Sequence, residues 1–231
     1  MQNSAKKIFG FTMGATDGEI GEVKDFYFDN SSWDIRYLVI ETGSWLIGRK
    51  VLISPVAVQS PEWDLKVLPV NHTKDQIRNS PDFDTEKPLS RQQETALHGH
   101  YAWPYYGGSG FTTTGMMAGG VAPTLPFDEQ VADAAHQPDE ELKDETSLRS
   151  IRHLIGYTVH ANDGELGEVA DFLIDDASWK VTHLVIETGN WFAGTKILAP
   201  VSEIMRMERE SSGVYLNSEL NSFENSTEFN F

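Results

Sequence analysis

The chain of 231 residues carries a formal net charge of −17 at pH 7 and contains no cysteine. The lack of cysteine excludes disulfides, thiol catalysis and cysteine-ligated zinc or iron–sulfur sites. The acidity argues against direct nucleic-acid binding, because phosphate backbones attract patches of lysine and arginine.

The length suits two domains of about 100 residues each. The sequence has no run of about 18 apolar residues, so no transmembrane helix is expected. The first residues lack an apolar stretch long enough for a secretory signal, and we therefore expect a cytoplasmic protein.

The same module occurs twice in the chain. The segment DGEIGEVKDFYFDNSSWDIRYLVIETGSWLIGRKVL at 17–52 returns at 163–198 as DGELGEVADFLIDDASWKVTHLVIETGNWFAGTKIL, an offset of 146 residues. A match of this length indicates a tandem duplication. We divide the chain into copy 1 at 1–84, a helical and linker segment at 85–147, and copy 2 at 148–231.

Each copy shows short predicted strands separated by turn residues, the pattern of a small β-barrel or sandwich. Asp17-Gly18 and Asp163-Gly164 predict tight turns between the first two strands, since both residue types tolerate positive φ. The predicted strands of copy 1 lie at 8–13, 19–29, 34–41, 49–53 and 64–70. Those of copy 2 lie at 154–159, 165–175, 180–187, 195–199 and 213–217.

Two capping-box sequences follow the strands of copy 1. TKDQ at 73–76 and SRQQ at 90–93 each predict the start of a short helix. Residues 101–126 are rich in glycine, proline and threonine, which predicts a linker, and an acidic stretch at 128–145 leads into copy 2.

The third predicted strand of each copy is apolar at nearly every position toward its end, at 35–40 and 181–186. A strand with one wet face should alternate, so we expect both faces to be covered, the second one by the other copy. The predicted fold class is therefore mainly β, with two small barrels in tandem related by a pseudo-twofold axis. Short helices follow each barrel, and a Gly/Pro-rich linker joins them.

The string GEIGEVKDF, followed by WDIRYLVIETG and KVLISP, resembles the PRC-barrel domain, and both copies fit. That family includes the cytoplasmic part of the photosynthetic reaction centre H subunit and a barrel of a ribosome maturation factor. The resemblance covers about 6–84 and 150–231. A nearer resemblance is to bacterial tandem PRC-barrel proteins, through LRS at 148–150 and NSP at 79–81. It implies a β-barrel used for docking and scaffolding rather than for catalysis.

Carboxylates recur at the start of both copies: Asp17, Glu19, Glu22 and Asp25, matched by Asp163, Glu165, Glu168 and Asp171. Oxygen ligands of this kind bind hard cations, so a small-ligand or metal-binding sensor is the alternative to a docking module. The spacing does not match a calcium-binding helix–loop–helix, and the first carboxylate of each set is a turn residue. We therefore predict structural roles and no metal site for Asp17, Asp25, Asp163 and Asp171.

Asp25 and Asp171 lie inside predicted strands, each beside a phenylalanine. A carboxylate in such a place needs hydrogen bonds, and backbone amides at a bulge or turn are the predicted donors. Lys50 and Lys196 are the candidates for an ion pair within the same copy.

Tryptophans and their neighbours are the predicted binding residues. Two loops place apolar side chains between glycines, GSWLIG at 43–48 and GNWFAG at 189–194. Such side chains bury large apolar areas at interfaces, although an aromatic ligand groove is a second interpretation. We predict contacts between the copies or with a partner for Trp33, Trp45, Leu46, Trp179, Trp191 and Phe192.

No pattern of catalytic residues is found. The sequence has no Gly-x-Ser-x-Gly motif, and the histidines differ between the two copies. We expect a non-enzymatic binding or assembly module with no catalytic residue and no cofactor. The expected partner is a protein, with a basic one favoured by the acidic exterior. The two copies are expected to pair within the chain, which is compatible with a homo-oligomer.

Overall fold

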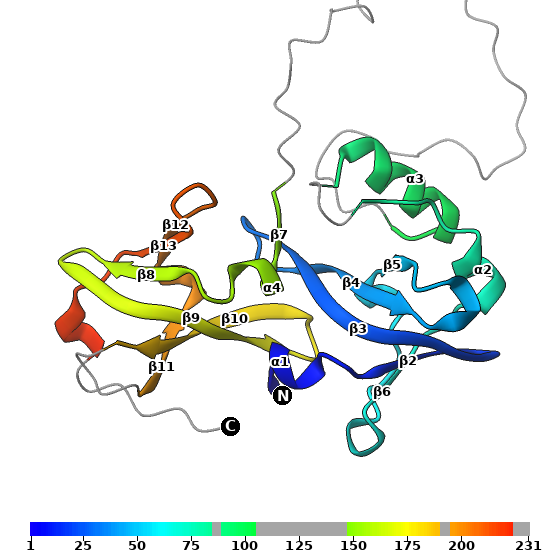
Figure 1. Ribbon diagram of the computed structural model, residues 1–231, viewed down its shortest axis with the longest axis horizontal. Helices are drawn as coiled ribbons and strands as arrows, with labels where there is room; N and C mark the ends of the chain where they lie inside the picture. Colours follow the sequence, from blue (N-terminus) through cyan, green and yellow to red (C-terminus); the bar gives the residue numbers. More distant parts are fainter. Residues whose placement is uncertain (85–88, 105–146, 190–194, 224–231) are drawn as a thin grey trace, which may run out of the picture.

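The computed structural model describes residues 1–84, 89–104, 147–189 and 195–223. The chain is mainly β and forms two sheets, which lie side by side with few and short helices (Figure 1). This agrees with the predicted fold class. None of the described helices is long and apolar enough to span a membrane.

The sheet of copy 1 is built around one long, bent strand. Its strands are β2 (Thr12–Ala15), β3 (Gly18–Asp29), β4 (Ile35–Thr42), β5 (Lys50–Ile53) and β6 (Val67–Pro69). Their order is β5-β4-β3-β2-β6, with β6 parallel to β2 and the other neighbours antiparallel. Two register shifts interrupt the pairing of β3 with β4, one of them at Asp25.

The sheet of copy 2 repeats this arrangement and adds one strand. Its strands are β8 (Thr158–Ala161), β9 (Gly164–Asp175), β10 (Lys180–Thr188), β11 (Lys196–Pro200), β12 (Ile204–Glu208) and β13 (Gly213–Leu216). Their order is β11-β10-β9-β8-β13-β12, with β13 parallel to β8 as β6 is to β2. The duplicated sequence therefore gives duplicated topology.

Two short strands cross from one copy to the other. β1 (Gln2–Ser4) precedes copy 1 but pairs with β9, and β7 (Leu148–Ser150) precedes copy 2 but pairs with β3. Each is followed by a short helix, α1 (Ala5–Ile8) or α4 (Ile151–Leu154), and both helices lie where the two sheets meet (Figure 1). The predicted pseudo-twofold relation thus takes the form of a reciprocal exchange of first strands.

The first central strand of each copy begins later than predicted. Strands were expected at 8–13 and 154–159, whereas β2 begins at Thr12 and β8 at Thr158. Gly10 and Gly156 have φ values of 81° and 88°, which turn the backbone between the short helix and the strand. Ile8 and Leu154, where the two strands were expected to start, are instead the last residues of the short helices α1 and α4.

The two helices predicted after the strands of copy 1 are confirmed. α2 (Lys74–Arg78) and α3 (Arg91–Tyr101) both begin with the expected capping box, at Thr73 and Ser90. The remaining helical segments are single 3₁₀ turns: η1 (Ser44–Leu46), η2 (Pro55–Ala57), η3 (Trp63–Leu65), η4 (Val201–Glu203) and η5 (Leu220–Phe223).

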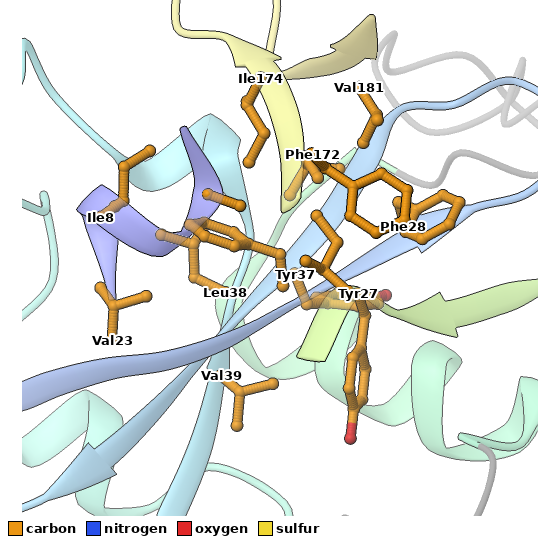
Figure 2. Close-up of a cluster of buried hydrophobic side chains, with 14 of the residues drawn as sticks. Ile8, Val23, Tyr27, Phe28, Tyr37, Leu38, Val39, Phe172, Ile174 and Val181 are labelled. Atoms are coloured by element: carbon orange, nitrogen blue, oxygen red, sulfur yellow. The ribbon is translucent and has the colours of Figure 1, made fainter. Parts of the chain in front are cut away.

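One hydrophobic cluster runs through both copies. Figure 2 brings side chains of both copies into one view: Ile8, Val23, Phe28 and Leu38 with Phe172, Ile174 and Val181. The rings of Phe28 and Phe172 have centroids 6.1 Å apart, and both side chains are fully buried. The two copies therefore share one core. Because burial of apolar area is the main source of stability, each copy stabilises the other.

Strand β4 is buried on both faces, as its apolar sequence predicts. Side chains 37–40 are at most 2% exposed. The hydroxyl of Tyr37 lies 2.8 Å from Nε2 of His98, so helix α3, rather than copy 2, covers this part of the strand. Copy 2 meets the start of the strand, where the N–H of Ile35 donates to the carbonyl oxygen of Trp179. The apolar pattern indicates a covered face but not which element covers it.

Candidate functional site

The loop of residues 43–48, between β4 and β5, forms an exposed apolar tip. Ile47 is 96% exposed, the highest value among the large hydrophobic side chains that the structure describes. Its φ of 56° is left-handed, which costs a residue with a side chain about 1–2 kcal/mol, and branching at Cβ adds to the strain. Leu46 is half-buried and packs on the core. In copy 2 the matching Trp191 and Phe192 lie outside the described residues.

Trp45 anchors the base of this loop to its own copy. Its Nε1–H donates to the carbonyl oxygen of Ile20 at 2.5 Å. The ammonium of Lys74 and the guanidinium of Arg78 lie 5.0 and 5.7 Å from the ring centroid, within cation–π range. The indole of Trp45 thus makes contacts within its own copy through both its N–H and its face. Ile47 is the apolar side chain of this loop that is exposed to an external partner.

Arg49 fixes the far end of the loop. Its Nε lies 2.7 Å from Oδ1 of Asp82. Its Nη1 and Nη2 donate to the carbonyl oxygens of Arg78 and Ser80 at 2.9 and 2.5 Å. These contacts from one planar guanidinium hold the loop against the end of α2 and the segment that follows it.

Trp33 and Trp179 lie where the two copies meet. The carbonyl oxygen of Trp179 accepts from the N–H of Ile35, and that of Trp33 accepts from the N–H of Val181, both at 2.8 Å. Both tryptophans have positive φ, 62° and 52°. The ring of Trp33 stacks on Phe28 with centroids 5.2 Å apart. The contacts between the copies at this point therefore include two backbone hydrogen bonds, with the buried ring of Phe28 and the partly buried ring of Trp33 beside them.

Asp25 joins copy 1 to the segment that begins copy 2. Its Oδ1 accepts from the backbone N–H of Phe26 at 2.7 Å and of Arg152 at 2.9 Å. Its Oδ2 accepts from the hydroxyl of Ser150. The expected amide donors are present, and one of them comes from the other copy.

Asp171 repeats this arrangement in the opposite direction. It accepts from the N–H of Phe172 at 2.8 Å, from the N–H of Lys6 at 3.2 Å and from the hydroxyl of Ser4. Burial raises the pKa of both carboxyl groups, and the hydrogen bonds act in the opposite direction, led by that from Ser150 on Asp25 and that from Ser4 on Asp171.

The charged groups near these carboxylates also come from the other copy. Arg152 lowers the pKa of Asp25, and Lys6 lowers that of Asp171, each as a smaller effect than burial. Lys50, the partner considered from the sequence, lies opposite Glu41 in the pairing of β4 with β5. Lys196 in the same way lies opposite Glu187 in copy 2.

Asp17 and Asp163 stabilise turns within their own copies. Each accepts a backbone N–H at 2.8 Å, from Lys74 and Leu220 respectively. Each thus caps the first turn of the helical segment that follows the last strand of its copy. Within the described ranges, no group of three or more histidine, aspartate or glutamate side chains could hold a metal ion.

A cluster of aromatic and histidine side chains between α3 and copy 1 had no predicted role. Tyr101 and Trp103, at the start of the predicted linker, are each only 8% exposed. Their rings stack with centroids 4.2 Å apart, and Nε1–H of Trp103 donates to Nε2 of His72 at 3.1 Å. The composition of 101–126 predicts a linker, but the aromatic residues at its start bury their rings.

Acidification should loosen this cluster. Burial, and to a lesser extent the charge of His100, lowers the pKa of His72 below the usual 6.5. The folded protein therefore binds fewer protons here than the unfolded chain. The contribution of His72 to stability is fully present above pH 6.5 and is lost as the pH falls toward the folded-state pKa. After correction for intrinsic exchange rates, we expect the indole N–H of Trp103 to be less protected at about pH 5 than at neutral pH, measured by NMR.

The indole of Trp45 supplies the control within the same molecule. It donates to the carbonyl oxygen of Ile20, which does not titrate in this range. Equal acceleration of exchange at Trp45 and Trp103, after correction for intrinsic rates, would contradict a role for His72.

Curated proteins give no match to the chain. The family model described as the PRC-barrel domain matches twice, at 5–74 and at 148–218. These segments contain the central strands of the two sheets and together span more than half of the sequence. The chain therefore belongs to the PRC-barrel domain family and carries two copies of that domain.

Proposed function

We propose that this chain is a non-enzymatic docking module that binds a protein partner through loop 43–48 of copy 1. The observation that supports this is Ile47, which is 96% exposed and held at a φ of 56°. Strained backbone conformations in folded proteins cluster at binding and switch regions. Glycine or asparagine would be more stable at this position, so the isoleucine favours a role outside the folding of the chain. Membership of the PRC-barrel family is compatible with a docking role.

The loop suits binding because it is held in one conformation before a partner arrives. Trp45 is fixed at Ile20 and Arg49 at Asp82, on either side of the tip. A preorganised loop loses little conformational entropy on association. In the proposed complex, Ile47 enters an apolar socket on the partner, and the polar groups around it form the rim.

The charge of the chain favours a partner with a basic surface around that socket. A net charge of −17 attracts such a surface over a distance comparable to the Debye length, about 8 Å at physiological ionic strength. Association should therefore be faster at low salt.

The alternative of a metal or small-ligand sensor would use the carboxylates at the Asp-Gly turns. Asp17 and Asp163 already accept backbone hydrogen bonds at 2.8 Å, which a ligand would have to break or share. Docking through the loop is therefore the function that we adopt.

The substitution Ile47→Asn separates docking from folding. Asparagine tolerates a left-handed conformation, so the variant should be as stable as the wild type or up to about 1 kcal/mol more stable. Loss of a central apolar contact should weaken partner binding at least about 30-fold, corresponding to 2 kcal/mol. Quantitative affinity capture from a native lysate, paired with thermal unfolding of both proteins, measures the two effects.

Leu65→Asn is the matched control, because Leu65 is 70% exposed and lies on η3 rather than on the loop. The same proteins should be captured by this variant and by the wild type. If Ile47→Asn also captures that same set in equal amounts, the proposed docking loop is wrong.

A further inference from the structure

The exchanged segments, residues 2–8 and 148–154, each add a strand to the long central strand of the other copy. Gln2, Asn3 and Ser4 lie opposite 173–175 of β9, and 148–150 lie opposite 27–29 of β3. The two registers are identical once the offset of 146 residues is applied. Addition of a strand to a sheet edge is a general mode of segment recognition, in which main-chain hydrogen bonds supply affinity.

The edges of β3 and β9 that take up these segments are called the acceptor edges. Each also binds a serine hydroxyl of the segment and the backbone N–H two residues later. Asp25 accepts from the hydroxyl of Ser150 and from the N–H of Arg152. Asp171 accepts from the hydroxyl of Ser4 and from the N–H of Lys6. These buried carboxylates would lose two of their three donors if the segments left.

Apolar packing completes the contact. Ala5 and Ile8 of α1 are at most 1% exposed, as is Ile151 of α4. Helix α1 packs on β9, and α4 packs on β3. The segments are therefore part of the shared core, and neither copy completes its own core without the other.

The interface is isologous in character, since the same chemical groups occur on both sides. Such an interface is the kind by which identical subunits form twofold dimers. Two copies that belong to different chains can therefore make the same contacts as the two copies within one chain. The partner that fits the acceptor edges is thus a second copy of this chain, carrying the same two segments.

We propose that residues 2–8 and 148–154 are docking segments that hold the two copies together without the covalent link, and that a second chain of this protein can supply them. In the intact chain, the tether gives a high effective concentration and favours pairing within the molecule. Cleavage of the tether removes that advantage and leaves the recognition itself. This proposal is independent of the docking loop at 43–48.

The test uses the folded full-length protein with a protease site inserted in the 105–146 segment. After cleavage, the two halves should stay together as one species in size-exclusion chromatography and native mass spectrometry at micromolar concentration. Isotopically heavy and light samples are then cleaved, unfolded together and refolded. Hybrid pairs of one heavy and one light half should form about as abundantly as the two parental pairs.

Two double variants identify the contact responsible. Asp25→Ala with Asp171→Ala should separate into halves after cleavage. Asp17→Ala with Asp163→Ala removes carboxylates whose hydrogen bonds, among the described residues, stay within their own copies, and this variant should remain paired. Separation of the wild-type halves on cleavage, or refolding without any hybrid, would overturn the proposal.

Discussion

Replacement of Asp25 by alanine should lower the free energy of unfolding by about 3 kcal/mol, because it leaves buried donors without an acceptor. The N–H groups of Phe26 and Arg152 and the hydroxyl of Ser150 all donate to this carboxylate. Asp25→Asn keeps an oxygen acceptor for the two amides and should cost about 1 kcal/mol. Urea unfolding of the wild type and both variants at neutral pH measures the difference.

The pH dependence of the stability of Asp25→Asn is a second test of the buried Asp25 carboxyl group. Burial raises the folded-state pKa of Asp25 above 3.8, so the folded protein binds more protons here than the unfolded chain just above that pH. This contribution therefore makes the wild type less stable as the pH rises through the window above 3.8. Asp25→Asn lacks this titration and should gain stability relative to the wild type over that window. If the free energies of unfolding of the two proteins differed by the same amount at every pH, the raised pKa of Asp25 would be contradicted.

A second large effect is expected at Gly21, where β3 pairs with the end of β4. A Cβ atom on Gly21 would lie 2.0 Å from the carbonyl oxygen of Glu41, far inside van der Waals contact. Gly167 in copy 2 has the same relation to Glu187, at 2.2 Å. Because the neighbour is backbone, the strands must separate to accommodate any side chain. Gly21→Ala should therefore cost at least about 3 kcal/mol, measured by thermal and urea unfolding.

Gly14→Ala is the matched control in the same sheet. The Cβ of an alanine at Gly14 would meet only Cγ1 of Val67, at an ordinary 3.7 Å. This change should alter stability by less than about 1 kcal/mol. Similar losses for Gly14→Ala and Gly21→Ala would mean that the close approach at Glu41 does not govern the effect.

Local sequence patterns predicted most of the central strands and the two helices α2 and α3. The repeated strings between turn residues gave the central strands of each sheet, and the capping boxes at Thr73 and Ser90 marked two helix starts. Both signals depend on residues a few positions apart. A pattern of this range is readable in one sequence.

The exchange of segments could not be predicted in this way. β1 and β7 are three residues long, QNS and LRS, with no alternation that marks a strand. Their partners lie more than 100 residues away in the chain. The sequence indicated that Asp25 needs amide donors, but only the fold shows that Arg152 supplies one.

The tip of the docking loop was also found only in part. The glycines and Trp45 predicted a contact surface at residues 43–48, because tryptophan is enriched among the residues that dominate binding at interfaces. In the structure the indole serves to anchor the loop, and the neighbouring Ile47 carries the exposure. Which of the three apolar residues 45–47 faces outward depends on the backbone dihedral angles, which composition does not show.

The reciprocal exchange has a consequence for the order in which the protein can fold during synthesis. Residues 2–4 are made about 170 residues before their strand partners, residues 173–175. The edge of β3 likewise stays open until residues 148–150 have been made. Until then, the nascent chain exposes unpaired strand edges and part of its core, which are the surfaces that make incomplete chains aggregate. Copy 1 therefore completes its strand pairing only after residues 148–150 and 173–175 of copy 2 have been made, and the duplicated halves mature as one unit.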